Sequence, residues 1–257
     1  KIKNPKNRFF ADPCVKHYNN RNIIFVEDFD YKKNKAVISA IEINPDKSYT
    51  ILGPVLDEDF HLSYPYIFEE NNELFMCPET HDSNDIRLYK CTEFPMKWEF
   101  DRILIKNVSA ADTNIFHHEN KWWIMTNIDS SDLGVKLDYH EHDSELHIFY
   151  ADSLDSNNWI SHPKNPVIFD SNQARNAGNI NSKDGELYRV FQEQSFDMYG
   201  KKFGITKILE LNTKNYKEKI LFKVPPNFYN NILGTHHYSF DNNLIALDYM
   251  TIKRSSR

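Results

Sequence analysis

A motif that recurs about every fifty residues constrains the fold of this chain more than any other feature. Copies begin near residues 9, 61, 109, 175 and 234. Each copy starts with a small or polar residue and a short apolar run. A turn rich in Asn, Asp or Gly follows, and an apolar and aromatic run then ends at a polar residue. Repeats of this length stack on one another, because a single unit cannot bury its own apolar face.

The apolar runs of the motif have the length and the boundaries of β-strands. Runs such as IIFV, WWIM and LIAL span four residues and are bounded by turn segments such as ENNE. Aromatic residues make up 14% of the chain, which also favours strands. Because there are only 7 glycines, we expect Asn and Asp to occupy many left-handed turn positions. The chain is therefore predicted to be all-β.

Further strand candidates follow each hairpin, so that each copy supplies about four strands. Five such units predict a five-bladed β-propeller, with residues 1–257 as a single domain. A β-sandwich and an irregular solenoid are the alternatives. The position-by-position agreement of four copies favours the propeller.

In a propeller, residues at equivalent repeat positions gather round one axis. Two such positions are mostly polar. One lies at the start of the first strand, and the other lies about fifteen residues later, across the hairpin. The first set is Asp12, Tyr64, Asp112, Gly178 and His236, and the second is Glu27, Glu79, Asn127 and Gln192 with its neighbour Glu193.

A ring of carboxylates is an arrangement for acid–base or nucleophilic chemistry. Cleavage of a glycosidic bond, for example, uses two carboxyl groups. Asp12 and Asp112 could each be turn caps, and Glu27 and Glu79 could each be ion-pair partners of arginines. Because the two aspartates share one repeat position, we favour a functional site and predict Asp12, Asp112 and Glu79 as its catalytic residues.

Four segments carry a family resemblance: FFADPCV, HLSYPYIFEENNELFMCPET, AADTNIFHHENKWWIM and WISHPKNPVIFDSNQARNAGNI. Over about residues 8 to 245 the chain resembles five-bladed propeller domains related to family-43 glycoside hydrolases. It is most similar to the group shared by the N-terminal region of plant glucosamine inositolphosphorylceramide transferases and by bacterial polysaccharide loci. The resemblance implies that Asp12 is a general base and that Asp112 orients the general acid. The Glu that serves as acid in the fourth blade is absent from ARNAGN, and Glu79 or Glu193 are the alternatives.

An incomplete acid–base set suits a leaving group that needs little protonation, such as a phosphate held by cations. We therefore expect a bacterial glycosyltransferase of surface-polysaccharide synthesis, with a phosphate-activated sugar donor and a glycan acceptor. A hydrolase acting on furanosides or xylosides and a non-catalytic sugar-binding propeller are the alternatives. The expected phosphate contacts are Arg175, His236 and His237, and the other expected substrate contacts are Tyr64, Glu27, Asn127 and Gln192.

The remaining features limit partners and cofactors. A net charge of −6 argues against nucleic acid as a partner, and no stretch approaches the roughly 18 apolar residues of a membrane span. Three cysteines without CxxC spacing indicate neither a disulfide framework nor a zinc site, so we expect a reducing, cytoplasmic location. The chain begins with Lys1, which suggests further catalytic domains in the same protein. No cofactor is established, and a calcium ion on the axis is left open. An insertion from about Asp129 to Glu145 is expected to form a rim of the pocket.

Overall fold

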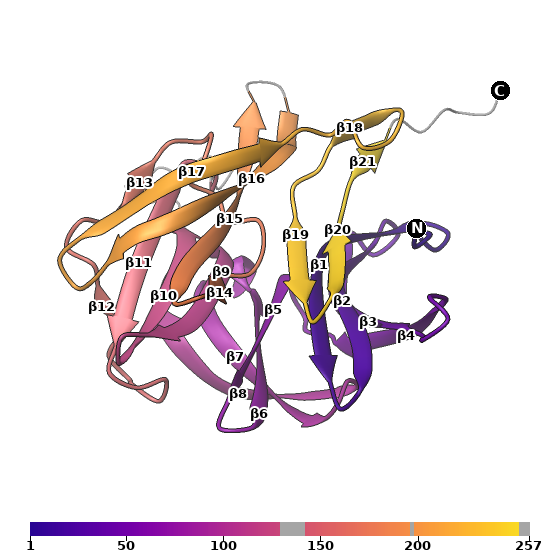
Figure 1. The fold of residues 1–257 in the computed structure, drawn as a ribbon. Helices are drawn as coiled ribbons and strands as arrows, with labels where there is room; N and C mark the ends of the chain where they lie inside the picture. The colour runs from indigo at the N-terminus through magenta and orange to yellow at the C-terminus, as the bar shows by residue number, and fades with distance from the viewer. Residues whose placement is uncertain (129–141, 196–197, 252–257) are drawn as a thin grey trace.

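The structure, a computed structural model, describes residues 1–128, 142–195 and 198–251. Most of the predicted insertion after Asp129 lies outside these ranges. The described residues form four sheets of four or five antiparallel strands each, arranged side by side around a centre (Figure 1). None of the described residues belongs to a helix that is long and apolar enough to cross a membrane.

The first and second sheets follow the chain strand by strand. A single turn of 3-10 helix, His81–Ser83, follows the second strand of the second sheet. The first sheet consists of β1 (Arg8–Tyr18), β2 (Arg21–Asp30), β3 (Lys35–Ile43) and β4 (Tyr49–Leu56), and the second of β5 (Ser63–Glu70), β6 (Glu73–Glu79), β7 (Asp85–Glu93) and β8 (Lys97–Lys106).

The third and fourth sheets repeat this plan with different outer strands. In the third sheet, two short strands both pair with β11. The third sheet consists of β9 (Ala110–His118), β10 (Lys121–Ile128), β11 (Glu145–Ala151), β12 (Ile160–Ser161) and β13 (Ile168–Phe169), and the fourth of β14 (Asn181–Lys183), β15 (Glu186–Ser195), β16 (Met198–Leu211) and β17 (Tyr216–Val224).

The prediction of an all-β propeller is confirmed, but the prediction of five blades is wrong, because the structure shows four. The fifth repeat does not form a four-stranded sheet. Up to Thr251, where the described part of the chain ends, its strands are short and make two separate pairs instead of one sheet. The pairs are β18 (Ile232–Gly234) with β21 (Met250–Thr251) and β19 (Tyr238–Asp241) with β20 (Leu244–Leu247).

The apolar core lies between neighbouring sheets. Phe25 and Trp98 belong to the cluster between the first and second sheets, and Tyr66 and Trp122 to the next one. Trp123 belongs to the cluster between the third and fourth sheets. Burial of an aromatic side chain of this size stabilises the fold by about 2–3 kcal/mol, so these interfaces hold adjacent blades together.

The short β19–β20 hairpin closes the ring between the fourth sheet and the first (Figure 1). On one side, Leu244 and Ala246 pack against the cluster that contains Val15 of β1. On the other side, Tyr238 packs against a cluster that contains Phe203 of β16. The hairpin of the fifth repeat therefore packs against both neighbouring blades, as a blade would, although it is not part of a four-stranded sheet.

Asparagine supplies most of the left-handed turn positions, as the low glycine content predicts. Pairs of adjacent residues with positive φ form the tips of hairpins, including Asn19–Asn20, Asn71–Asn72 and Asn242–Asn243. Asn tolerates this conformation better than most residues do, because its short side chain can hydrogen-bond locally.

Candidate active site

The first-position residues stand at equivalent irregularities of three blades. Asp12, Tyr64 and Asp112 have φ angles of 48°, 44° and 50°, and each lies at a register shift in the first strand of its sheet. Such a bulge re-aims a side chain. A left-handed conformation at a residue other than glycine costs on the order of 1 kcal/mol or more, and such strain clusters at functional sites.

Asp12 lies in a buried cage of polar groups. Its Oδ1 is 3.1 Å from Nε2 of His236 and 3.5 Å from Nδ1 of His237, and its Oδ2 accepts a hydrogen bond of 3.3 Å from the backbone N–H of Tyr64. Burial alone would raise the pKa of Asp12, but the two histidines outweigh it and hold the pKa below its ordinary value. Asp12 is therefore a carboxylate at neutral pH.

Asp248 completes this side of the site. Its Oδ2 lies 3.2 Å from Nδ1 of His236 and accepts a 3.3 Å hydrogen bond from the backbone N–H of Asp12. Burial lowers the pKa of His236, but Asp248 and Asp12 outweigh it and raise the pKa well above the ordinary value. Sequence reasoning missed Asp248. The polar residue that ends the second apolar run of the fifth repeat is the signal that could have found it.

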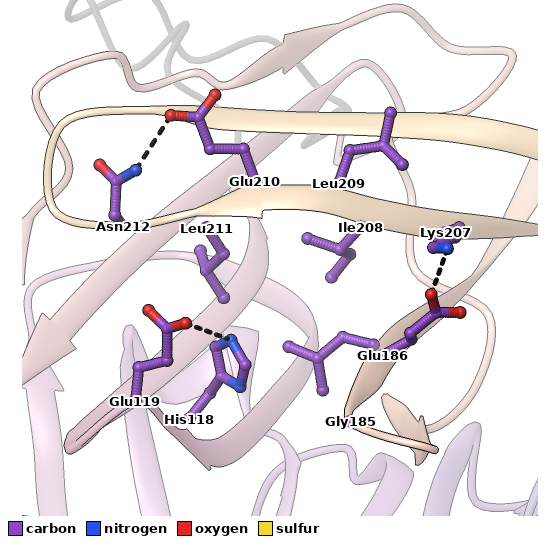
Figure 2. Close-up of a pocket in the computed structure, with 11 residues that line it drawn as sticks. His118, Glu119, Gly185, Glu186, Lys207, Ile208, Leu209, Glu210, Leu211 and Asn212 are labelled. Atoms are coloured by element: carbon purple, nitrogen blue, oxygen red, sulfur yellow. Dashed lines mark hydrogen bonds and ion pairs between the residues drawn. The ribbon is translucent and has the colours of Figure 1, made fainter.

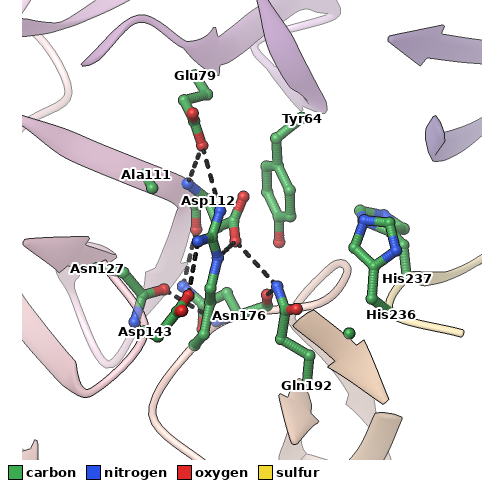
Figure 3. A network of polar contacts seen from close by, with 12 residues as sticks. Tyr64, Glu79, Ala111, Asp112, Asn127, Asp143, Asn176, Gln192, His236 and His237 are labelled. Carbon is green, nitrogen blue, oxygen red and sulfur yellow. Dashed lines mark hydrogen bonds and ion pairs between the residues drawn. The ribbon is translucent and has the colours of Figure 1, made fainter. Parts of the chain in front are cut away.

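Arg175 belongs to the ARNAGN segment of the fourth repeat, which carries no Glu. Its guanidinium lies 2.6 Å from Asp112, 2.8 Å from Asp143 and 3.9 Å from Glu79. Figure 3 shows these three acidic side chains close to one another. Its charged group also lies 5.0 Å from the centre of the Tyr199 ring. The guanidinium is therefore engaged by three carboxyl groups of the protein, so a phosphate contact would require one of these contacts to open.

The carboxylates around Arg175 differ in their affinity for protons. Burial raises the pKa of Asp112 to about 8, with the charges of Glu79 and Asp12 adding to the effect and Arg175 opposing it. Burial would also raise the pKa of Glu79, but His81 and Arg175 lower it to about 2. Glu79 also accepts a 3.2 Å hydrogen bond from the backbone N–H of Asp112. Glu79 is therefore ionised and unsuited to donate a proton.

Glu27 lies on the strand next to Asp12, because its register partner in β1 is Ala11. Its Oε1 is 3.3 Å from Nε2 of His61, which precedes β5. Burial raises the pKa of Glu27 to about 7, with the charges of Asp12 and Glu79 adding to the effect and His61 opposing it. His61 was not predicted, and no repeat position identifies it, because it stands in a connecting segment.

Tyr64 is buried, and its hydroxyl group is fully used within the protein. The hydroxyl donates to the carbonyl of Gly178 at 2.8 Å and accepts from the N–H of Gly178 and from Nδ2 of Asn114, both at 3.1 Å. Its ring meets His237 edge-on, with centroids 5.0 Å apart (Figure 3). In the described structure Tyr64 thus ties the second repeat to the fourth across the axis.

Asn127 and Gln192 also lie at the site. Asn127 donates to the carbonyl groups of Glu145 and Ala174 and accepts from the backbone N–H of Asn176, so its amide holds two blades together. Gln192 donates to Asp112 at 3.4 Å. All ten predicted site residues thus lie together at one end of the propeller axis. Asn127 and Tyr64, however, use their polar atoms for contacts within the protein.

Glu193, one alternative for the missing acid, is held by two lysines of its own blade. Lys202 lies 2.8 Å from one carboxylate oxygen, and Lys223 contacts the other. Burial would raise the pKa of Glu193, but these lysines lower it. Glu193 is therefore an ionised carboxylate.

A calcium ion on the axis does not fit the groups that the structure describes. Asp12, His236 and Asp248 each have a donor atom within 4.8 Å of the others. Calcium takes 6–8 oxygen ligands. This set offers one nitrogen and two carboxylates that already accept N–H groups.

Two grooves lie away from these residues. One, of about 490 Å³, is lined by hairpin turns that include His118 and Gly185 and by part of β16 (Figure 2). His118 is six residues beyond Asp112 along β9, a separation of about 20 Å in an extended strand. The other, of about 650 Å³, lies between β8 and residues 157–159. Neither groove includes a residue of the predicted site.

Fold and site together define an all-β propeller with a buried ring of carboxylates, histidines and one arginine at one end of its axis. The chain matches the family described as "Glucosamine inositolphosphorylceramide transferase 1, N-terminal" over residues 2–243, and it therefore belongs to this family. Relatives named glucosamine inositolphosphorylceramide transferase 1, from Arabidopsis thaliana and Oryza sativa subsp. japonica, are each 32% identical over 82% of this chain. The chain spans 27% of the length of these plant proteins.

Solved structures show the same fold. The catalytic domain of a Coprinopsis cinerea family-62 α-L-arabinofuranosidase aligns with a TM-score of 0.68 and 12% identity, covering 100% of this chain and 88% of that one. A thermostable family-43 glycoside hydrolase aligns with a TM-score of 0.61 and 14% identity, covering 83% and 75%. At such identities the likeness establishes the fold alone.

Proposed function

We propose that this chain is a carbohydrate-active enzyme that transfers a glycosyl group from a phosphate-activated donor to a hydroxyl group of a glycan acceptor. The observation that carries the proposal is Asp12, an ionised buried carboxylate that a strained bulge turns towards the axis. The names of the plant relatives, which are transferases, and of the fold neighbours, which are glycoside hydrolases, support a substrate of this class.

In this proposal Asp12 accepts the proton of the attacking hydroxyl group. Asp112 and Arg175, which contact each other, orient the donor. His237 is buried; its Nδ1 lies 3.5 Å from the Asp12 carboxylate, and within the described residues its Nε2 has no hydrogen-bond partner. A buried polar group without a partner is unfavourable, so His237 is the group best placed to contact a donor phosphate.

Hydrolysis of a furanoside or xyloside is the second candidate. The specific observation in its favour is the pair formed by Asp12 and Glu27 on one hairpin, since glycosidases use one carboxylate and one protonated carboxyl group. The two candidates share the site and differ in whether water or a glycan hydroxyl group attacks.

A substrate panel tests these proposals. The protein is incubated with nitrophenyl glycosides, and separately with nucleotide sugars and phosphoribosyl pyrophosphate plus oligosaccharide acceptors. Transfer predicts donor-dependent extension of an acceptor, and hydrolysis predicts release of nitrophenol without an acceptor. If sugars bind equally to wild type and Asp12→Asn and nothing is turned over, the chain is a binding propeller and the enzymatic proposal is overturned.

A cytoplasmic location stays a prediction. The three cysteines, two of them buried, are free thiols in the structure. Fractionation of the source cells would check the location.

A further inference from the structure

Glu27 departs from a hydrogen-bond pattern that the other repeats share. In the second, third and fifth repeats, the side chain at the second position accepts a bond from a backbone N–H group of the repeat that follows. Among the described residues Glu27 receives no such bond, because the corresponding N–H group, that of Tyr64, donates to Asp12. The three regular bonds join Asp112 to Glu79, Asn176 to Asn127 and Asp12 to Asp248, at 3.2, 2.9 and 3.3 Å.

The partner that Glu27 does have connects it with solvent. His61 lies 3.3 Å from the carboxyl group, and the side chain of His61 is 25% exposed, whereas that of Glu27 is 10% exposed. The ring of His61 also lies 5.9 Å from that of Phe29, two residues beyond Glu27 on β2. An imidazole in this position can carry a proton between water and a buried carboxyl group.

Burial and two of the three groups that face Glu27 raise its affinity for a proton. Asp12 approaches from β1, Glu79 from β6 and His61 from the segment before β5. Burial, with the charges of the two carboxylates, raises the pKa of Glu27 to about 7 against the opposing effect of His61, while the histidines beside Asp12 hold its pKa low. Neighbouring carboxyl groups whose pKa values are pushed apart are the usual sign of an acid and a base.

We propose that Glu27 is the proton donor of the reaction and takes the place of the acid that the fourth repeat lacks. This inference rests on the proposed function in its second form, hydrolysis of a glycoside, because a glycoside oxygen needs a proton to leave and a donor phosphate does not. As the bond between the anomeric carbon and the leaving oxygen breaks, that oxygen takes the Glu27 proton. The attacking oxygen forms its bond to the same carbon and gives its proton to Asp12. His61 then passes a proton from solvent to Glu27, and Asp12 releases its proton to solvent.

The first test compares two leaving groups on the sugar that the substrate panel identifies. A dinitrophenyl glycoside leaves readily without protonation, whereas an unsubstituted phenyl glycoside needs an acid. Glu27→Gln should lower kcat/KM about 100-fold or more for the phenyl glycoside and less than about 10-fold for the dinitrophenyl glycoside. Glu42→Gln, which changes a carboxylate at the surface of the same blade, is the matched control. Equal losses for both substrates would overturn the proposal.

The second test follows protonation without turnover. In protein labelled with ¹³C at glutamate carboxyl groups, NMR titration should show a step near pH 7 in the wild type and in Glu42→Gln, but not in Glu27→Gln. A missing step in the wild type refutes this inference while the proposed function stands. A step without turnover of any donor refutes the proposed function and, with it, this role of Glu27.

Discussion

Replacement of Glu27 by Gln should change the pH dependence of stability in a direction that is uncommon for a carboxyl group. The pKa of Glu27 is raised from 4.5 to about 7 in the folded protein. Below pH 4.5 Glu27 is protonated in both the folded and the unfolded state, so the stability linked to its raised pKa is fully present there. That stability is lost as the pH rises to 7, where the folded protein must ionise a buried group.

The magnitude follows from the shift. At about 1.4 kcal/mol per pKa unit, a shift of about 2.5 units destabilises the wild type by about 3 kcal/mol above pH 7.5, relative to acid pH. Gln has the same shape and does not ionise. The variant should therefore match the wild type near pH 4.5 and be about 3 kcal/mol more stable at pH 8. His61, whose pKa is raised by Glu27, changes the wild type in the same direction.

Urea unfolding followed by tryptophan fluorescence at pH values from 4.5 to 8.5 measures this difference. Glu42→Gln should behave in the opposite way, because Arg21 lowers the pKa of Glu42 and that pair stabilises the protein above pH 4.5. Because both members of the pair are partly exposed, the effect should stay below about 1 kcal/mol. If the difference between wild type and Glu27→Gln is constant across the range, Glu27 ionises normally and the reasoning is refuted.

Two further predictions concern Tyr64 and Gly178, which are hydrogen-bonded to each other near the axis. Gly178→Ala should lower the free energy of unfolding by about 3 kcal/mol or more, because a Cβ atom would lie 1.9 Å from the carbonyl oxygen of Tyr238. Thermal denaturation measures this loss. Gly53→Ala is the control, because φ is also positive there but the space is open, and it should lower the free energy of unfolding by only about 1 kcal/mol. Equal losses in the two variants would show that no clash occurs at Gly178. Tyr64→Phe should cost about 1–3 kcal/mol in urea unfolding, because the N–H of Gly178 and the amide of Asn114 lose their buried acceptor. An unchanged midpoint would contradict that account.

The repeat made the centre of this site predictable from the sequence. Asp12, Tyr64 and Asp112 occupy one repeat position, and the structure places them at equivalent bulges. The proximity of Glu27 to Asp12 followed from a hairpin whose turn fixes the register of β1 against β2. Periodicity thus located these residues, because the same local geometry recurs in each copy.

Other parts of the site have no periodic signal. His61 and Asp143 come from segments between strands, whose paths depend on tertiary contacts. Asp248 follows His236 by twelve residues rather than fifteen, because the fifth repeat forms a shorter hairpin. The ion pairs of Arg175 could not be predicted either, because their carboxylates belong to other repeats and to an insertion.

The fifth blade shows a limit of a different kind. The motif of the fifth copy is present, and its hairpin packs on both neighbours as the repeat predicts. The motif predicts only the inner hairpin of a blade. The outer strands depend on the residues that follow the motif. Counting motifs therefore gave five units where the structure shows four full sheets.

The most direct test of the central claim, that the ring around Asp12 is a carbohydrate-active site, is the turnover of Asp12→Asn with the donor or glycoside that the panel identifies. Asp184→Asn is the control, since Asp184 is an exposed turn residue with a φ of 53° that Asn tolerates. We predict that Asp12→Asn lowers kcat by about 100-fold to 10,000-fold, as expected for loss of a general base. The control should retain wild-type turnover. Wild-type turnover by folded Asp12→Asn protein would contradict the account.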